Sequence, residues 1–386
     1  MSQVETEAQA LLRSGALYPF RLGLQAAGDS LIYVGVKHGA ISLYFGNDPS
    51  YHFDLEGRWQ RCYVDPSHYL RRRDGSTQAI DRPRVAGQMV LDRRTLGQEE
   101  AEGLDETIRR MAVDLADRVR SGALSVGEPP APAKRIEQEV LLDLLGRIAR
   151  WDALRWAKDR RAFAAIYEGS PVLPPEALDA LVLQATRPKP GGSGSAARSP
   201  EEFAEHCRAI AEWLGQGVVP VRSLFLAGPD VLRRPAEEVE AFLRIAQEVF
   251  PLADAPAPAR RSDLPVDRPH REGILAMVGD SEGPTPKGED WARFQKLGLR
   301  RVVFGVALGE MESSDEVVTP WEELVRMVPE ARASGLGVSL VVWTGSVALS
   351  TESETQAEVV GLIRSLGLGK GDHVYLVEED EAQGAA

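Results

Sequence analysis

The sequence predicts an α/β protein with two differently built parts, and two observations lead to this. Residues 20–92 divide into short stretches that alternate apolar and polar side chains between turn signals, which is typical of an antiparallel meander. From about residue 178 onward, short apolar runs instead alternate with amphipathic stretches, as strands and helices do around a parallel sheet. We therefore expect a parallel sheet with helices, preceded by a small antiparallel β-rich domain and further helices.

The β-rich domain is expected over residues 1–96. Six of the eight tyrosines lie between Tyr18 and Tyr69, and aromatic residues favour strands. Turn signals break this region at regular intervals, as hairpin connections require. They are Gly28-Asp29, His38-Gly39, Gly46-Asn47-Asp48-Pro49, Glu56-Gly57 and Asp74-Gly75.

A helical connector is expected over residues 97–170. Apolar residues recur with helical spacing in 97–121 and again in 134–163. Between them, a proline-rich linker near 122–133 is expected to be extended. We expect the second helical stretch to pack on the domain that follows it.

The third domain is expected over residues 171–386, and its apolar runs predict six strands. These runs are 180–186, 222–228, 273–279, 300–309, 337–345 and 373–379. The stretches between them predict helices at 200–214, 235–249, 288–297, 320–334 and 352–366. Strand–helix–strand order implies parallel pairing through right-handed crossovers. The pattern alone leaves open a doubly wound open sheet and a three-quarter barrel.

The overall charge limits the classes of partner. The formal net charge is −13, which argues against a general nucleic-acid binder because phosphate binding needs a cationic surface. No apolar run is long enough to predict a membrane span, and the polar, acidic start does not resemble a signal peptide. We therefore expect a soluble, cytoplasmic protein with no nucleic-acid or membrane partner, and with a protein or small molecule as its ligand.

Several segments of the third domain resemble the radical S-adenosylmethionine (SAM) superfamily. VRSLFLAGPDVLRRPAEEVEAFLRIAQEVFP is similar to the second β/α unit of its elongator-protein and coproporphyrinogen-dehydrogenase-like group. GEDWARFQKLGL and LRRVVFGVALG resemble the helix before the fourth strand and that strand, ASGLGVSLVVWTG the fifth unit, and LGKGDHVYLVEE the closing one. The resemblance covers about 200 residues in the same unit order. It implies a (β/α)6 partial TIM barrel with its reaction centre at the carboxyl ends of the strands.

The residues that define this family's chemistry are missing. In the family, a Cys-x3-Cys-x2-Cys motif after the first strand holds an iron–sulfur cluster that binds S-adenosylmethionine. Here the first strand is followed by RPKPGGSGSAAR, residues 187–198, which we expect to be a flexible loop. The chain has only two cysteines, Cys62 and Cys207, and we expect Cys207 to be buried on a helix. The family implies both cofactors, but their ligands are missing, so we expect neither.

A second departure lies on the fourth strand, where relatives commonly end in Gly-x-Glu-Ser-Gly and use the glutamate to hold the cosubstrate. The matching segment is Gly305-Val306-Ala307-Leu308-Gly309, so this degenerate cosubstrate position, with Gly305, Ala307 and Gly309, carries no carboxylate. The turn after the second strand, often Gly-Gly-Glu in relatives, reads Ala227-Gly228-Pro229-Asp230. The absence of both the cluster cysteines and the cosubstrate glutamate indicates a barrel that no longer carries out radical chemistry.

Three hypotheses for function are compatible with these residues. The preferred one is a degenerate, radical-SAM-like pseudoenzyme without a cluster, which acts as an accessory module that binds a protein or small molecule. An alternative is an enzyme of another kind that reuses the barrel mouth, with Asp230, Asp280, Glu310 or Glu378 as acid or base. A second alternative is a radical SAM enzyme whose cluster is held unusually, for instance between subunits. Whether the protein is an enzyme thus stays open, and no catalytic residue is assigned.

Residues at the ends of the predicted strands would converge on one pocket. The candidates are Gln184, Thr186, Asp230, Asp280, Glu310, Trp343, Thr344, Glu378 and Glu379. They would give a small-molecule pocket with acidic groups and an aromatic wall. The alternative is that they are turn, cap and core residues.

The β-rich domain offers two weaker candidates. His38, His52 and His68 could bind a metal if they met in space, although their spacing matches no metal motif. The second candidate is a set of aromatic and basic residues that could form a recognition face. The set is Tyr33, Tyr44, Tyr51, Tyr63, Tyr69, Trp59, Arg71, Arg72 and Arg73. Cross-strand packing is the favoured interpretation of these aromatic residues.

Overall fold

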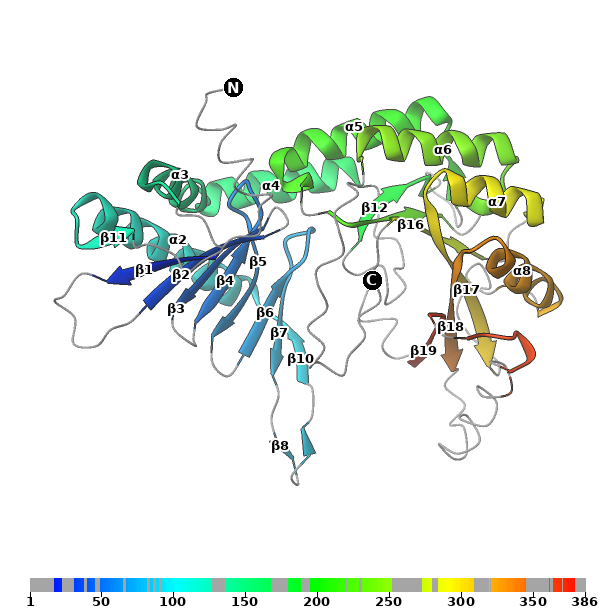
Figure 1. The fold of residues 1–386 in the computed structure, drawn as a ribbon, viewed down its shortest axis with the longest axis horizontal. Coiled ribbons are helices and arrows are strands. Elements are labelled where there is room, and N and C mark those ends of the chain that lie inside the picture. The colour runs from blue at the N-terminus through cyan, green and yellow to red at the C-terminus, as the bar shows by residue number, and fades with distance from the viewer. Residues whose placement is uncertain are drawn as a thin grey trace. The chain divides into compact units, whose positions relative to one another are not determined.

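The computed structural model divides the chain into two compact units, whose elements are labelled in Figure 1. It describes residues 17–22, 31–37, 40–45, 49–64, 67–81, 84–85, 88–89, 92–126, 136–167, 180–188, 195–219, 221–228, 231–251, 273–279, 284–308, 319, 321–344, 361, 364–369 and 371–378. The first unit comprises Met1–Ile166 and Glu212–Pro220. The second comprises Tyr167–Ala211 and Val221–Ala386.

The first unit is built on an antiparallel sheet of nine strands, which confirms the β-rich N-terminal region. The strand order is β10-β7-β6-β5-β4-β3-β2-β1-β11, so neighbours along the chain are mostly neighbours in the sheet. The strands are β1 (Leu17–Leu22), β2 (Leu31–Lys37), β3 (Ala40–Phe45), β4 (Ser50–Phe53), β5 (Trp59–Val64), β6 (Ser67–Arg71), β7 (Thr77–Asp81), β10 (Asp92–Thr95) and β11 (Leu124–Val126). A separate hairpin joins β8 (Arg84–Val85) and β9 (Gln88–Met89). Part of the predicted linker is the strand β11, which pairs with β1 at the edge of the sheet.

Three helices share one core with this sheet. They are α2 (Gln98–Arg120), α3 (Gln138–Ala149) and α4 (Ala153–Ile166). Buried residues of β2 to β5, α2 and α3, together with Trp151 and Trp156, form a single hydrophobic cluster. Most of residues 134–163 therefore packs within the first unit rather than on the following domain, although Asp159 and Phe163 of α4 do contact Trp213, at the end of α5. That stretch is also two helices rather than one, because the Asp152 carboxylate accepts the backbone N–H of Arg155 and caps the start of α4.

The second unit is built on a parallel sheet of six strands, and all six predicted strands are present. They are β12 (Leu181–Gln184), β15 (Ser223–Ala227), β16 (Gly273–Val278), β17 (Leu299–Leu308), β18 (Gly337–Thr344) and β19 (His373–Glu378). The order is β12-β15-β16-β17-β18-β19, and every neighbouring pair is parallel. A doubly wound sheet reverses its strand order partway across. This sheet does not, so of the two arrangements left open by the pattern the doubly wound one is excluded.

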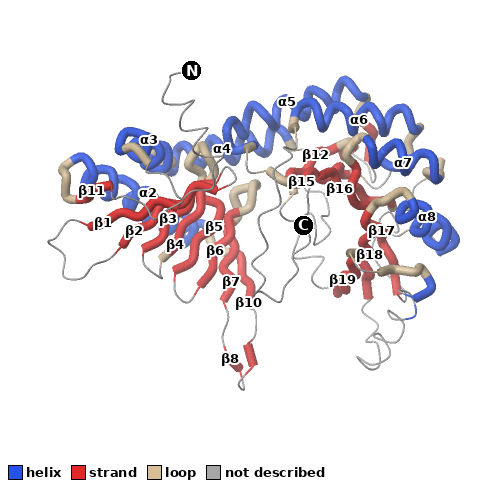
Figure 2. The backbone as a smooth tube through the Cα atoms, in the orientation of Figure 1, coloured by secondary structure: helices blue, strands red, loops and turns tan. Residues whose placement is uncertain are grey.

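Helices connect these strands and lie along one side of the sheet (Figures 1 and 2). They are α5 (Pro200–Leu214), α6 (Ala236–Val249), α7 (Gly288–Lys296) and α8 (Trp321–Ala333), with the short helix η3 (Val231–Arg233). The short helix η2 (Gly215–Val218) belongs to the first unit. Helices α5 to α8 match four of the five predicted helices. The fifth, expected at 352–366, lies mostly outside the described residues. Equal handedness at each crossover places successive helices on the same face.

The other face of the parallel sheet is apolar as well. A buried cluster contains alternate strand residues, among them Phe225, Leu275, Met277, Val303 and Val341, and includes no residue of α5 to α8. The residues between them, such as Leu224 and Leu226, point to the opposite face because strand side chains alternate. Both faces are thus covered, as the continuous apolar runs predicted.

Candidate functional site

The structure places part of the predicted pocket at the carboxyl ends of the parallel strands. Gln184 ends β12 and Thr186 begins β13 (Thr186–Pro188), and both are buried. Trp343 and Thr344 end β18, and Thr344 is in register with Glu378 on β19. For these last three residues the structure describes only the backbone. Asp230, Asp280, Glu310 and Glu379 lie outside the described residues.

These residues come from strands at opposite edges of the sheet. In the strand order, β12 with Gln184 is at one edge, and β18 and β19 with Thr344 and Glu378 are at the other. Their convergence on one pocket stays a prediction. At the degenerate cosubstrate position, Ala307 is in register with Trp343, and the backbone oxygen of Gly305 accepts the N–H of Thr319 at 2.8 Å. Gly309 lies outside the described residues.

A short hairpin follows β12, in the segment that we expected to be a flexible loop. Strand β13 pairs antiparallel with β14 (Ser195–Ala197). The backbone N–H of Arg198 then bonds the oxygen of Ala185 at 2.9 Å, and Arg187 pairs with Glu202 at 3.2 Å. The flanks of the segment expected to be a flexible loop are therefore paired strands, while residues 189–194 lie outside the described residues.

Both cysteine thiols are buried inside the protein. Cys62 is 2% exposed in the core of the first unit, and Cys207 is fully buried on α5, as predicted. Burial raises the pKa of each thiol to about 12, and for Cys62 the nearby Asp105 charge adds to the effect. Because the thiolate is the form that binds metal, neither residue is suited to hold an iron–sulfur cluster.

Two polar contacts near the ends of the parallel strands were not anticipated from sequence. The backbone N–H of Gln184 donates to Nε2 of buried His206 on α5, and the Tyr167 ring stands edge-on to this histidine. Arg233, on η3 after β15, donates from Nε to the oxygen of Gly279 at 2.7 Å and pairs with Glu323 of α8. A buried arginine between two strand ends fixes their spacing. The only feature of the sequence that pointed to Arg233 was its position shortly after an apolar strand.

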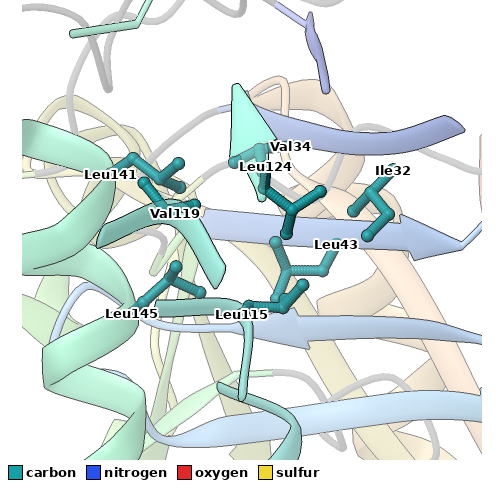
Figure 3. Close-up of a pocket in the computed structure, with 8 residues that line it drawn as sticks. All are labelled: Ile32, Val34, Leu43, Leu115, Val119, Leu124, Leu141 and Leu145. Carbon is teal, nitrogen blue, oxygen red and sulfur yellow. The ribbon is translucent and has the colours of Figure 1, made fainter. Parts of the chain in front are cut away.

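Two cavities lined by described residues lie in the first unit. One, of about 10 Å³, is lined entirely by aliphatic side chains of the sheet, α2, α3 and β11 (Figure 3). It is a packing gap too small and too apolar for a polar ligand. The other, of about 40 Å³, has a polar lining, and this volume suits one or two water molecules. Its lining residues are Glu102, Asp105, Glu106, Trp151, Ala153, Trp156 and Arg160.

A buried ion pair borders the polar cavity. Asp105 of α2 accepts hydrogen bonds from Arg71 Nη1 and Trp59 Nε1, each at 2.6 Å. The Arg71 guanidinium lies 3.6 Å from the centroid of the Trp156 ring, as in a cation–π contact. Burial raises the pKa of the Asp105 carboxyl, and the Arg71 charge and the Trp59 hydrogen bond oppose this. Trp156 Nε1 is buried and has no hydrogen-bond partner among the described residues, so one donor is left for a molecule in the cavity.

A second charged cluster surrounds Arg58, at the start of β5. Its guanidinium bonds the backbone oxygens of Trp213 and Leu214 at 2.7 and 3.0 Å, and pairs with Asp54 and Asp159 at 3.2 Å each. The two oxygens belong to the last turn of α5, where carbonyls lack helical partners. Arg58 therefore supplies hydrogen-bond donors to the free carbonyl oxygens at the end of α5, within the first unit.

Neighbouring groups reinforce this cluster. Glu56 accepts the backbone N–H of Gln216, and Arg147 donates to the Gln216 side chain at 2.7 Å. Gly57 has φ +83°, and a Cβ there would lie 2.6 Å from the backbone of Arg147. The Glu56-Gly57 turn signal was thus a site of close backbone approach, which the sequence alone could not show.

The aromatic and histidine candidates of the first unit are divided between the two faces of the sheet. Tyr51, Trp59 and Tyr69 belong to the core cluster or pack against it. Tyr44 and Tyr63 are half-buried on the opposite face, where their rings meet His52 and His68. Arg71 lies in the core, Arg72 and Arg73 follow β6 in the turn to β7, and the Tyr33 side chain is not described. The proposed recognition set is therefore not one surface.

The histidines form no metal site in the part of the chain that the structure describes. His52 on β4 and His68 on β6 share a face, but β5 with Tyr63 lies between them. His38 lies outside the described residues. The described residues contain no group of three or more histidine, cysteine or carboxylate residues that could hold a metal ion.

His52 gives the first unit a pH-dependent stability. Burial, and then the Arg61 charge, lower its pKa to about 4, while Ser42 Oγ lies 2.8 Å from its Nδ1. In the unfolded chain the residue titrates near pH ~6.5. The unfolded state therefore binds the proton first, and stability falls as pH decreases from about 6.5 towards 4.

We expect the free energy of unfolding to decrease by about 1 kcal/mol from His52 alone between about pH 7.5 and pH 5. Urea unfolding of the native chain and of His52→Gln at both pH values measures this contribution. The variant should lose less stability than the native chain on acidification. Equal losses in the two proteins would show that His52 does not contribute.

Comparison with known proteins gives no relative. No protein-family model matches the chain, and no curated protein matches it. Among the described residues, no helix is long and apolar enough to cross a membrane. The function of the chain is therefore argued from its own residues and their geometry.

Proposed function

We propose that the second unit is a radical-SAM-like partial barrel that has lost its cluster chemistry, and that the protein acts as an accessory binding module. The six parallel strands in sequential order support this, because the resemblance requires that order and a singly wound sheet. The functional assignment rests on one observation above all. The position of the cluster loop is flanked by a strand pair, β13–β14, and offers no thiol.

The residues of this chain do not fit an iron–sulfur cluster. Three thiolates must converge on it, whereas the sequence has two cysteines. These are buried in different units, and their thiols are held in the protonated form. The cosubstrate position has lost its carboxylate as well, since Ala307 stands there. We therefore derive no reaction step through such a cluster.

A binding role agrees with the kind of residues that remain. The face of the parallel sheet away from α5 to α8 carries apolar residues such as Phe225, Met277 and Val341, and the strand register adds Arg301, His373 and Tyr375 to it. A mostly apolar lining with a few polar groups is typical of ligand sites. The carboxylates considered for the alternative enzyme lie outside the described residues or have undescribed side chains, so no observation favours that alternative.

Anaerobic reconstitution with iron and sulfide tests the loss of cluster chemistry. We expect the full chain to show no brown charge-transfer absorption, and to retain no more iron after desalting than a Cys62→Ala/Cys207→Ala variant. That variant is the matched control, because it removes both thiols and leaves every other ligand. A stoichiometric four-iron cluster, present in the native chain and lost in the variant, would falsify the proposal.

A further inference from the structure

We infer that the face of the nine-stranded sheet opposite α2 and α3 is a docking surface for a protein partner that presents carboxylate side chains. We call this surface the open face. It consists of the strand residues that alternate with the core residues on β3 to β7 and β10. At its centre are Tyr44, His52, Arg61, Tyr63, His68 and Leu70. This inference deepens the proposed accessory role by giving its partner's chemistry.

The strand register assembles these residues into a continuous surface. Tyr63 is directly opposite His68, which is opposite Ile80, which is opposite Arg93 on β10. In the neighbouring row, Arg61 lies between His52 on one side and Leu70 on the other. Directly opposed residues of antiparallel strands have adjacent side chains on the same face. The open face therefore crosses six strands without interruption.

No helix of the first unit that the structure describes covers this face. The hydrophobic core that includes α2 and α3 involves the other set of strand residues, such as Leu43, Phe53 and Cys62. Figure 1 shows α2 behind the sheet as it is viewed there. Arg61 and Arg93 are exposed, and the aromatic residues between them are half-buried. Tyrosine and arginine together on one sheet face are residue types enriched at protein interfaces.

Two pairs of aromatic rings give the open face a fixed shape. Tyr44 and His52 meet edge to face at 5.7 Å between ring centroids, and Tyr63 and His68 lie 4.5 Å apart. Such pairs hold the rings in place, so little side-chain entropy is lost when a partner packs on them. Tyrosine and arginine are the residue types that most often dominate binding energy at protein interfaces.

Charge indicates which partner fits. The chain has 58 acidic residues and a net charge of −13. The described side chains of the open face nevertheless include no carboxylate, and its remaining positions are neutral, for example Ser42, Ser50 and Gln78. Arg61 and Arg93 are the arginines among its described side chains, and a pKa of about 4 leaves His52 neutral at physiological pH. A surface with exposed arginines and no acid is complementary to carboxylates.

A protein partner is favoured over a nucleic acid, although both are anionic. The negative net charge repels a polyphosphate and an acidic protein alike, so it does not distinguish the two. The open face carries Leu70 and Ile80 beside its aromatic residues, and apolar groups match a mixed protein surface better than a phosphate backbone. The expected occupant thus places carboxylates opposite the arginines and apolar side chains opposite the rings.

Fluorescence anisotropy with the full-length chain tests this inference. The probe is a labelled peptide in which glutamate and leucine alternate, with a lysine–leucine peptide and a thymidine oligonucleotide as comparisons. The variant is Arg61→Glu/Arg93→Glu, whose exposed positions should leave the thermal melting temperature unchanged. The control is Arg110→Glu/Lys158→Glu, which makes the same charge change on α2 and α4.

We expect saturable binding of the glutamate–leucine peptide, weakened about tenfold or more in the open-face variant and less than about twofold in the control. The other two probes should not bind. Three results would overturn the inference: no binding of the acidic peptide, equal weakening in both variants, or tighter binding of the oligonucleotide. None of them depends on iron, so the outcome is separate from the reconstitution experiment.

Discussion

Replacing Asp105 with leucine is expected to lower the free energy of unfolding of the first unit by about 3–5 kcal/mol. Asp105 is 7% exposed and is the ion-pair partner of Arg71, which is 9% exposed. The substitution leaves the guanidinium buried among Trp59 and Trp156 without the carboxylate to which it is hydrogen-bonded. It also removes the acceptor of the Trp59 indole N–H. An uncompensated buried charge is among the few single changes with so large an effect.

Urea unfolding followed by tryptophan fluorescence measures the loss. The matched control is Asp114→Leu, on the same helix, whose partner Arg118 is at the surface. It should change stability by less than about 0.5 kcal/mol. The double variant Arg71→Met/Asp105→Leu should recover most of the loss, because it removes both charges together. A loss for Asp105→Leu no larger than that of the control would contradict the prediction.

The strands and helices of the second unit could be predicted from sequence because each has a local signal. A fully buried parallel strand is a continuous apolar run, and the helices begin near prolines and acidic residues, as at Pro200 and Pro235. The break between α3 and α4 also had a local signal, the Asp152 cap. An apolar stripe that continued across the break concealed it.

The division of the aromatic residues between two faces could not be predicted from alternation. Trp59 and Cys62 are both in the core although they are three residues apart, which strict period two does not allow. A β-bulge permits it, because Phe53 is opposite Trp59 while His52 is opposite Arg61. The bulge shifts Tyr63 to the open face. Its position depends on the partner strand and leaves no mark in the sequence of β5.

The candidate site was predicted less well because its key contacts join distant parts of the chain. Arg71 meets Asp105 across 34 residues, and Arg233 meets Glu323 across 90. The sequence shows each as an ordinary charged residue. The sequence alone shows that the chain has two cysteines and that residue 307 is alanine. Which surfaces the chain presents follows only from its fold.

Replacing Arg58 with methionine is expected to destabilise the first unit by about 3–5 kcal/mol, mainly through the segment Glu212–Pro220. The change leaves Asp54, which is 2% exposed, without its cationic partner and frees the carbonyl oxygens of Trp213 and Leu214. Because methionine retains most of the apolar part of the arginine side chain, the loss of stability measures the contribution of the guanidinium group. Arg58→Lys keeps the positive charge but cannot donate hydrogen bonds in several directions as the planar guanidinium does. It should therefore lower the free energy of unfolding by an intermediate amount.

Hydrogen exchange of the full-length chain locates the effect. Amides of residues 213–219 should exchange faster in Arg58→Met than in the native chain, while amides of β16 to β18 keep their protection. Arg94→Met is the control, because Arg94 pairs with Glu100 at a position where both side chains are about half exposed. Such a pair contributes less than about 1 kcal/mol. Unchanged exchange at 213–219 in Arg58→Met would mean that Gln216 and its contacts with Glu56 and Arg147 hold the segment without the arginine.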